Sequence, residues 1–166
     1  MKPVDRELAD GVGPMSMYHD AVNARYGAGD HYEAALTLMV AGRQLAAVIG
    51  EVLKEHGLTL PQWSVLTILH LAPNEQIPLG RIAQALGVHG TTITNAVDRL
   101  AELGLAVRTV DAADRRSVRA STTEAGAGRA EAIMRRLARE QFGLAGLSEA
   151  DLRTLSGLLG KVVSLP

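Results

Sequence analysis

The chain has 166 residues, of which 47% are hydrophobic and 21% are charged, and its net charge at neutral pH is −1. The length fits one domain, or one domain with helical extensions, and the composition provides enough apolar side chains for a core, so the chain need not be disordered. Because the sequence contains no cysteine, disulfides, thiolate catalysis and thiolate zinc sites are excluded.

Residues 1–29 give weak structural signals and are interpreted as an N-terminal extension. The first residues, MKPVDRELADG, lack the apolar run of a secretory signal, and a short helix is expected between Pro14 and Tyr26. We find no stretch that approaches the roughly 20 apolar residues of a membrane span. We therefore expect a soluble, cytoplasmic protein without a membrane partner.

Two helices are expected next, and both begin with a capping signal. Asp30 with Glu33, and Thr59 with Gln62, have the spacing of a capping box. Apolar residues at helical intervals follow Glu33 as far as Leu53, and Pro73 stops the second helix.

The next segments predict a helix-turn-helix followed by a β-hairpin. PLGRIAQALG and VHGTTITNAVDRLAELG form two short helices joined by a turn that contains Gly87. Residues 107–121 have β-branched flanks around a charged tip, which is typical of two short strands. A hairpin in this place is a wing, and its tip, which has no apolar side chain larger than alanine, is expected to reach outward.

Two further helices are expected, an arginine-rich one over residues 123–143 and an apolar-seamed one over residues 148–163. The expected fold class is therefore mainly α with a small β wing. A winged helix-turn-helix lobe over residues 59–122 lies between the helices 30–58 and 123–166, with residues 1–29 as the extension.

The positive charge of the chain is concentrated around the wing. Between Arg108 and Arg139 there are eight arginines against four acidic residues, a local charge of +4 that leaves −5 for the rest of the chain. Such a segment is typical of a nucleic-acid interface. On charge alone, a solvated helix face explains the arginines equally well.

The central block resembles the MarR family of winged-helix transcription regulators. The matching residues are Val97-Asp98-Arg99-Leu100, Gly104-Leu105, Arg108, Asp114-Arg115-Arg116 and Thr123-Glu124-Ala125-Gly126, together with Gln62-Trp63. The resemblance implies an obligate homodimer built from the first and last helices, and two lobes on a pseudo-palindromic operator. It also implies a small-molecule pocket between the dimerisation helices and the DNA-binding lobe.

Candidate DNA-binding residues lie on the second helix of the helix-turn-helix and on the wing: His89, Thr91, Thr94, Asn95, Arg99, Arg115 and Arg116. Asparagine suits a bidentate contact with adenine, and arginine suits the negative potential of a narrow minor groove. The alternative is an ordinary polar helix face, with His89 only standing at the helix start.

Asp98 is unexpected on a helix that faces DNA, because a carboxylate repels phosphate. The resemblance implies that it pairs with Arg116 and fixes the wing. The alternative is an acidic patch formed by Asp98 and Glu102 without a partner.

Three residues are candidates for binding a small organic effector, aromatic or anionic: Arg43, Trp63 and His70. Core packing is the alternative for Trp63 and His70, and an exposed position at the dimer edge is the alternative for Arg43. The histidines lack metal-ligand spacing, so neither a metal nor a cofactor is expected. No nucleophile–base constellation is visible, so we do not expect an enzyme.

The sequence therefore predicts a ligand-responsive, sequence-specific DNA-binding regulator. It is expected to be a repressor that a small molecule releases from its operator. The alternative is a winged-helix module that binds protein and has no DNA-binding activity.

Overall fold

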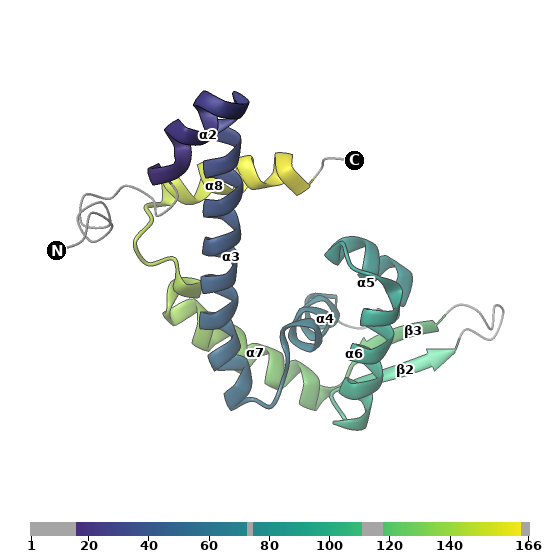
Figure 1. The fold of residues 1–166 in the computed structure, drawn as a ribbon. Coiled ribbons are helices and arrows are strands. Elements are labelled where there is room, and N and C mark those ends of the chain that lie inside the picture. Colours follow the sequence, from purple (N-terminus) through teal and green to yellow (C-terminus); the bar gives the residue numbers. More distant parts are fainter. Residues whose placement is uncertain (1–15, 73–74, 111–117, 164–166) are drawn as a thin grey trace. The chain divides into compact units, whose positions relative to one another are not determined.

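The computed structural model describes residues 16–72, 75–110 and 118–163 (Figure 1). The chain divides into two compact units, Met1–Ala47 and Val48–Pro166.

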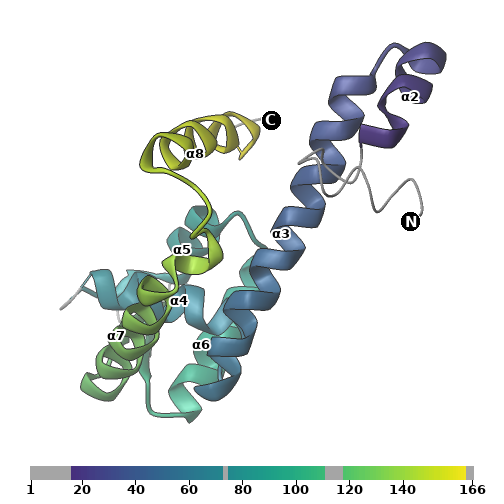
Figure 2. The same cartoon turned by 90° about the vertical axis from the view of Figure 1, so that its left-hand side faces the viewer.

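The first unit contains η1 (Ser16–Tyr18), α2 (His19–Tyr26) and most of α3 (Gly29–Glu55). Gly27 ends α2 in the left-handed conformation, with φ of 66°, and the chain turns back so that α2 lies beside the first turns of α3 (Figure 2). The approach is close at Gly29, where an added side-chain carbon would lie 2.8 Å from the Asn23 Cβ.

The start of α3 differs from the expected capping box. Asp30 lies inside the helix, and its Oδ1 is 2.8 Å from the Nε2 of His19, whose Nδ1 is 3.0 Å from Asp20. Hydrogen bonds to Asp20 and then Asp30 raise the pKa of His19 above its ordinary value. Asp30 therefore ties α2 to α3 and does not cap α3.

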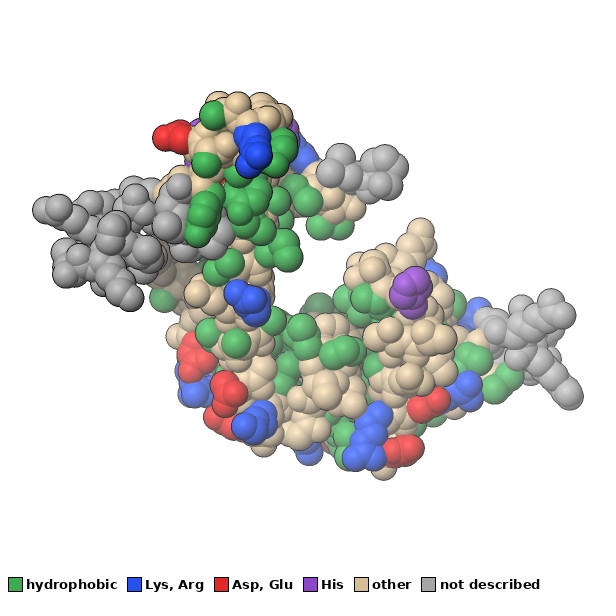
Figure 3. All heavy atoms as spheres, viewed as in Figure 1, with side chains coloured by type: hydrophobic (Ala, Val, Ile, Leu, Met, Phe, Trp, Pro, Cys, Tyr) green, Lys and Arg blue, Asp and Glu red, His purple; other side chains and the backbone are tan. Residues whose placement is uncertain are grey.

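The expectation that no stretch approaches a membrane span was wrong for α3. This helix has 27 residues and a window of mean hydropathy 1.5, of which 11% is buried, so by length and composition it is able to cross a membrane. Arg43 and Gln44 interrupt the apolar run, but the mean hydropathy of the window still reaches 1.5. Figure 3 shows hydrophobic side chains gathered over the N-terminal half of this helix.

The second unit is built around one apolar core. It contains the end of α3 and the following elements: α4 (Leu60–Leu71), β1 (Ile77–Pro78), α5 (Leu79–Leu86), α6 (Gly90–Glu102), β2 (Ala106–Val110), β3 (Val118–Thr122), α7 (Glu124–Arg139), η2 (Gln141–Gly143) and α8 (Glu149–Val163). Leu66 from α4, Ile82 from α5, Ile93 from α6 and Ile133 from α7 are all fully buried there. The elements α5, α6, β2 and β3 form the expected winged helix-turn-helix.

Local sequence signals explain how this lobe begins and turns. The Thr59–Gln62 capping box forms as expected, and the Gln62 Oε1 accepts the backbone N–H of Thr59 at 2.9 Å. Gly87 ends α5 with φ of 63°, and its N–H bonds back to the last turn of α5. This left-handed residue lets α6 start after two further residues.

The wing is anchored by a three-stranded antiparallel sheet in the order β1-β3-β2. Arg108 pairs with Ala120 in the register of β2 and β3, and Ile77 of β1 pairs with Ala120 from the other side. The hairpin was expected, whereas the two-residue strand β1 was not.

The helix expected over residues 123–143 ends at Arg139. Thr123 caps it by accepting the N–H of Gly126 at 3.0 Å and donating its hydroxyl to Gly104 at 2.8 Å. After Arg139 the chain bends, because Gln141 and Phe142 have φ of 50° and 53°.

Candidate nucleic-acid interface

Helix α6 has one buried and one exposed face. Its buried side chains are Ile93, Ala96, Val97 and Leu100. This packing leaves Thr91, Asn95 and Asp98 exposed on the opposite face, with Thr94 half-buried beside them. The helix therefore presents its polar residues outward, as an element that enters a DNA groove must do.

The hydrogen bonds of α6 determine what these residues offer. The Thr94 hydroxyl donates to the carbonyl of Gly90 at 3.1 Å. Within the described part of the chain, the Asn95 amide has no hydrogen-bond partner. His89 stands at the N-cap, exposed, and its side chain makes no capping bond.

The charged residues of α6 lie toward its C-terminal end. Asp98 Oδ1 is 3.2 Å from Arg108 Nε on β2, and Glu102 is 2.7 Å from Arg99 on the same helix. The alternative of an unpartnered acidic patch is therefore wrong, because each carboxylate faces an arginine. The expected partner, Arg116, lies outside the described residues, so that pairing stays a prediction.

The Asp98–Arg108 pair connects the recognition-type helix to a wing strand. Both side chains are substantially exposed, at 49% and 37%, so the pair contributes about 0–1 kcal/mol to stability. Its effect is on position, because it orients Arg108 beside α6. Arg108 was visible in the sequence motif, but no pattern there identified its partner.

The wing tip with Arg115 and Arg116 also lies outside the described residues. At the base of the wing, Val107 and Val110 are exposed at 48% and 47%, and Arg119 donates to the carbonyl of Gln76 at 3.3 Å. Both valines belong to β2, so this strand is exposed on both of its faces there.

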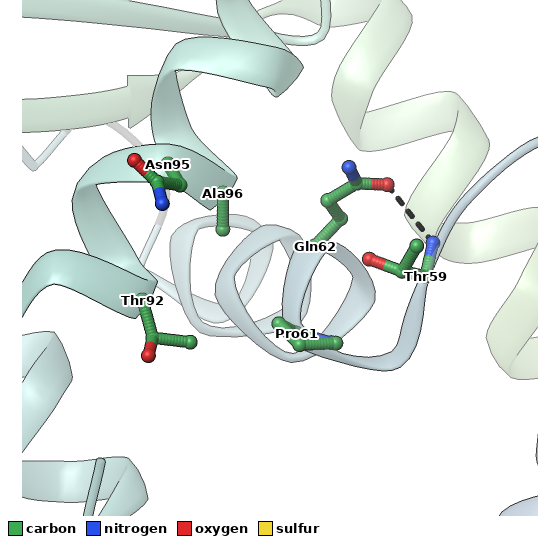
Figure 4. Close-up of a pocket in the computed structure, with 6 residues that line it drawn as sticks. All are labelled: Thr59, Pro61, Gln62, Thr92, Asn95 and Ala96. Carbon is green, nitrogen blue, oxygen red and sulfur yellow. Dashed lines mark hydrogen bonds between the residues drawn. The ribbon is translucent and has the colours of Figure 1, made fainter. Parts of the chain in front are cut away.

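A small hollow lies beside α6, between its N-terminal half and the start of α4. It has a volume of about 250 Å³ and is lined by Thr59, Pro61, Gln62, Thr92, Asn95 and Ala96 (Figure 4). Figure 4 shows Gln62 and Asn95 on either side of Ala96. Since the Gln62 oxygen is held by Thr59, its amide N–H groups are left to serve as donors.

The candidate effector residues fall in different units. Arg43 lines an apolar pocket of about 490 Å³ with Leu36, Met39 and Val40 in the first unit. Trp63 and His70 are half-buried on α4 in the second unit, and Trp63 packs against the core. Two buried polar groups of α4 have no hydrogen-bond partner among the described atoms: the Trp63 indole N–H and, one turn later, the Thr67 hydroxyl. Thr67 was not identified from the sequence.

Within the described ranges, no group of three or more His, Cys, Asp or Glu side chains is arranged to hold a metal ion.

Comparison with known proteins gives consistent matches. A model of the MarR family matches residues 56–117. A probable transcriptional regulator from Pseudomonas aeruginosa is 30% identical, with a TM-score of 0.66 over 77% of this chain and 95% of that one.

Two ligand-bearing structures are also similar. MepR from S. aureus, crystallised with DNA, is 26% identical, with a TM-score of 0.67 over 79% of this chain and 96% of that one. CouR from Rhodococcus jostii RHA1, bound to p-coumaroyl-CoA, has a TM-score of 0.70 at 24% identity over 81% and 94%, and so shows the same fold.

Proposed function

Since the chain belongs to the MarR family of transcriptional regulators, we propose that it is a homodimeric repressor that binds a specific operator. A small molecule releases it from the DNA. The observation that carries this proposal is the exposed polar face of α6, beside which the Asp98–Arg108 pair orients an arginine of the wing strand β2.

The proposed DNA contact uses α6 in the major groove. The N-terminal residues of a recognition helix reach the base edges, while the wing contacts backbone or minor groove. Thr91, Thr94 and Asn95 occupy the first half of α6, and Arg115 and Arg116 are assigned to the wing tip from the sequence. Two copies read half-sites roughly 34–36 Å apart, one turn of the duplex.

The proposed dimer explains the apolar character of α3 without a membrane. Large hydrophobic side chains are exposed on this helix and on α8, among them Met39 at 68% and Leu158 at 55%. Exposed apolar patches of this kind mark interfaces. A second copy that covers α3 and α8 removes them from water, and the expected mass in solution is twice the 17.6 kDa of the chain.

The proposed effector is aromatic or anionic. Arg43 offers a cation, and Trp63 offers a buried indole N–H without an acceptor among the described atoms; His70 is the third candidate. The two DNA-binding lobes of a dimer can be spaced so that they fit the operator or so that they do not. A ligand that binds the second arrangement more tightly shifts the population of dimers toward it. A coupling of about 1–3 kcal/mol weakens operator binding by roughly 5- to 150-fold.

The test is a binding titration with duplex DNA from the region upstream of its own gene. We expect binding at least about 10³-fold tighter than to a scrambled duplex of the same composition, and a dimer by light scattering. Equal affinity for both duplexes contradicts sequence-specific recognition.

One observation favours the protein-binding alternative. Asp98 and Glu102 against Arg99 give α6 a net charge of −1, which repels phosphate. Binding to neither duplex, with an intact fold, supports that alternative.

A further inference from the structure

Only the first half of α6 is suited to reading bases. Its exposed side chains there, Thr91 and Asn95, are neutral, and the half-buried Thr94 beside them is neutral too. Figure 3 shows neutral side chains over this part of α6 and charged ones toward its C-terminal end. Sequence preference of this helix must therefore come from hydroxyl and amide groups.

Asn95 is the strongest of these reading groups. Its amide is exposed and carries both donors and an acceptor, none of them engaged by another described residue. An asparagine amide matches the N6 amino group and N7 of adenine in a bidentate contact. Guanine presents two acceptors at the same edge, so one of its contacts with the amide is lost.

Thr94 offers an acceptor and no donor. Its hydroxyl proton is directed to the Gly90 carbonyl at 3.1 Å, and a hydroxyl has a single proton. The remaining lone pairs match an amino group in the major groove, which adenine and cytosine carry. Guanine O6 and thymine O4 are acceptors and repel the same oxygen.

Arginine, the usual reader of guanine, is not available in this half of the helix. The arginine of α6 is Arg99, near the C-terminal end and 2.7 Å from Glu102. Arg108 on β2 is directed to Asp98 at 3.2 Å. Each guanidinium group is therefore engaged by a carboxylate.

We propose that Asn95 selects an adenine in each half-site and that Thr94 selects an amino-bearing base, adenine or cytosine, at the neighbouring position. This inference rests on the proposed function and adds to it the bases that α6 distinguishes. An arginine–guanine contact from α6 is not part of the recognition.

The test is selection of binding sequences from a randomised duplex library, with the wild-type protein and variants. The wild type is expected to enrich an inverted repeat with one adenine position per half-site. Asn95→Ala is expected to lower the preference at that position by about 5- to 150-fold and to leave the rest of the motif unchanged.

Thr94→Val has a matched control. Thr154 on α8 donates to the carbonyl four residues earlier at 3.0 Å, as Thr94 does at 3.1 Å. Thr94→Val is expected to lose discrimination next to the adenine position, while Thr154→Val keeps the wild-type motif. Thermal unfolding of both variants measures what the lost local bond costs the fold.

Two results overturn the inference while the proposed function stands. One is a wild-type motif with guanine at the positions that respond to Asn95→Ala; the other is an adenine preference that survives this substitution. If the wild type enriches no sequence at all, the proposed function fails, and the inference fails with it.

Discussion

Gly126 is the position where the smallest substitution is expected to do the most damage. A methyl group added there would lie 1.9 Å from the carbonyl oxygen of Leu105 and 2.6 Å from the Thr122 hydroxyl. Leu105 directly precedes β2, so the clash is with the backbone at the base of the wing. Relief to 3.0 Å, the shortest separation that real Cβ atoms show, requires a shift of at least 1.1 Å.

The magnitude follows from two opposing effects. Alanine is favoured over glycine in a helix by about 1 kcal/mol. Overpacking against a rigid neighbour costs about 1–3 kcal/mol, and sometimes more. Because the neighbour here is backbone, we expect Gly126→Ala to lower the free energy of unfolding by about 2 kcal/mol, which is roughly 4–8 °C in a chain of this size.

Gly128 provides the matched control on the same helix. A methyl group added there meets nothing within 4 Å, so Gly128→Ala is expected to raise the free energy of unfolding by up to about 1 kcal/mol. The assay is thermal unfolding of the wild type and both variants by circular dichroism at one protein concentration. Equal or higher stability of Gly126→Ala would refute the reasoning, because it requires that α7 and the wing base separate at no cost.

Three further results are expected. Arg115→Ala should flatten the slope of log affinity against log salt by about 0.9 per lost phosphate contact, nearly 2 per dimer; an unchanged slope in the DNA titration removes the wing tip from the interface. Asp98→Ala should weaken operator binding, although it removes a carboxylate near DNA, because it releases Arg108; Glu102→Ala, a carboxylate on the same helix without a wing contact, should not weaken it, and tighter binding by Asp98→Ala contradicts the positional role. The raised pKa of His19 makes the α2–α3 contact fully stabilising below about pH 6.5, with that stabilisation lost as pH rises through the folded pKa. Protection of α2 against hydrogen exchange should therefore fall over that range, and Asp30→Asn should reduce this dependence, leaving the part that comes from Asp20; the same pH profile in both proteins excludes the His19–Asp30 contact as its cause.

The features that the sequence predicted correctly are those that depend only on residues close together in the chain. Thr59 and Gln62 are three residues apart and cap α4 whatever the rest of the chain does. Gly87 ends α5 because the left-handed conformation suits glycine. The exposed face of α6 followed from the spacing of its apolar residues.

The features that sequence did not predict depend on contacts between distant segments. Strand β1 has only two residues, and it is defined by the pairing of Ile77 with Ala120 on β3. Two residues are too few to show the alternation of apolar and polar side chains by which a strand is predicted. Asp98 meets Arg108 across the start of the wing, and no local pattern selects that arginine over its neighbours. The orphaned Thr67 hydroxyl depends on packing around α4, which the apolar pattern leaves unspecified.

The bend after α7 sets the direction in which α8 leaves the lobe. None of the residues of α8, all of which the structure describes, is buried, so contacts do little to hold its direction, and the backbone at Gln141 and Phe142 decides it. Left-handed conformations cost such residues roughly 1–2 kcal/mol each, and Phe142 packs against the core. Glycine at position 141 or 142 would adopt this conformation without strain, but it would also allow many other backbone conformations and therefore many other directions for α8. Variation at this elbow is therefore a route by which a few substitutions re-aim a whole helix while the winged lobe keeps its structure.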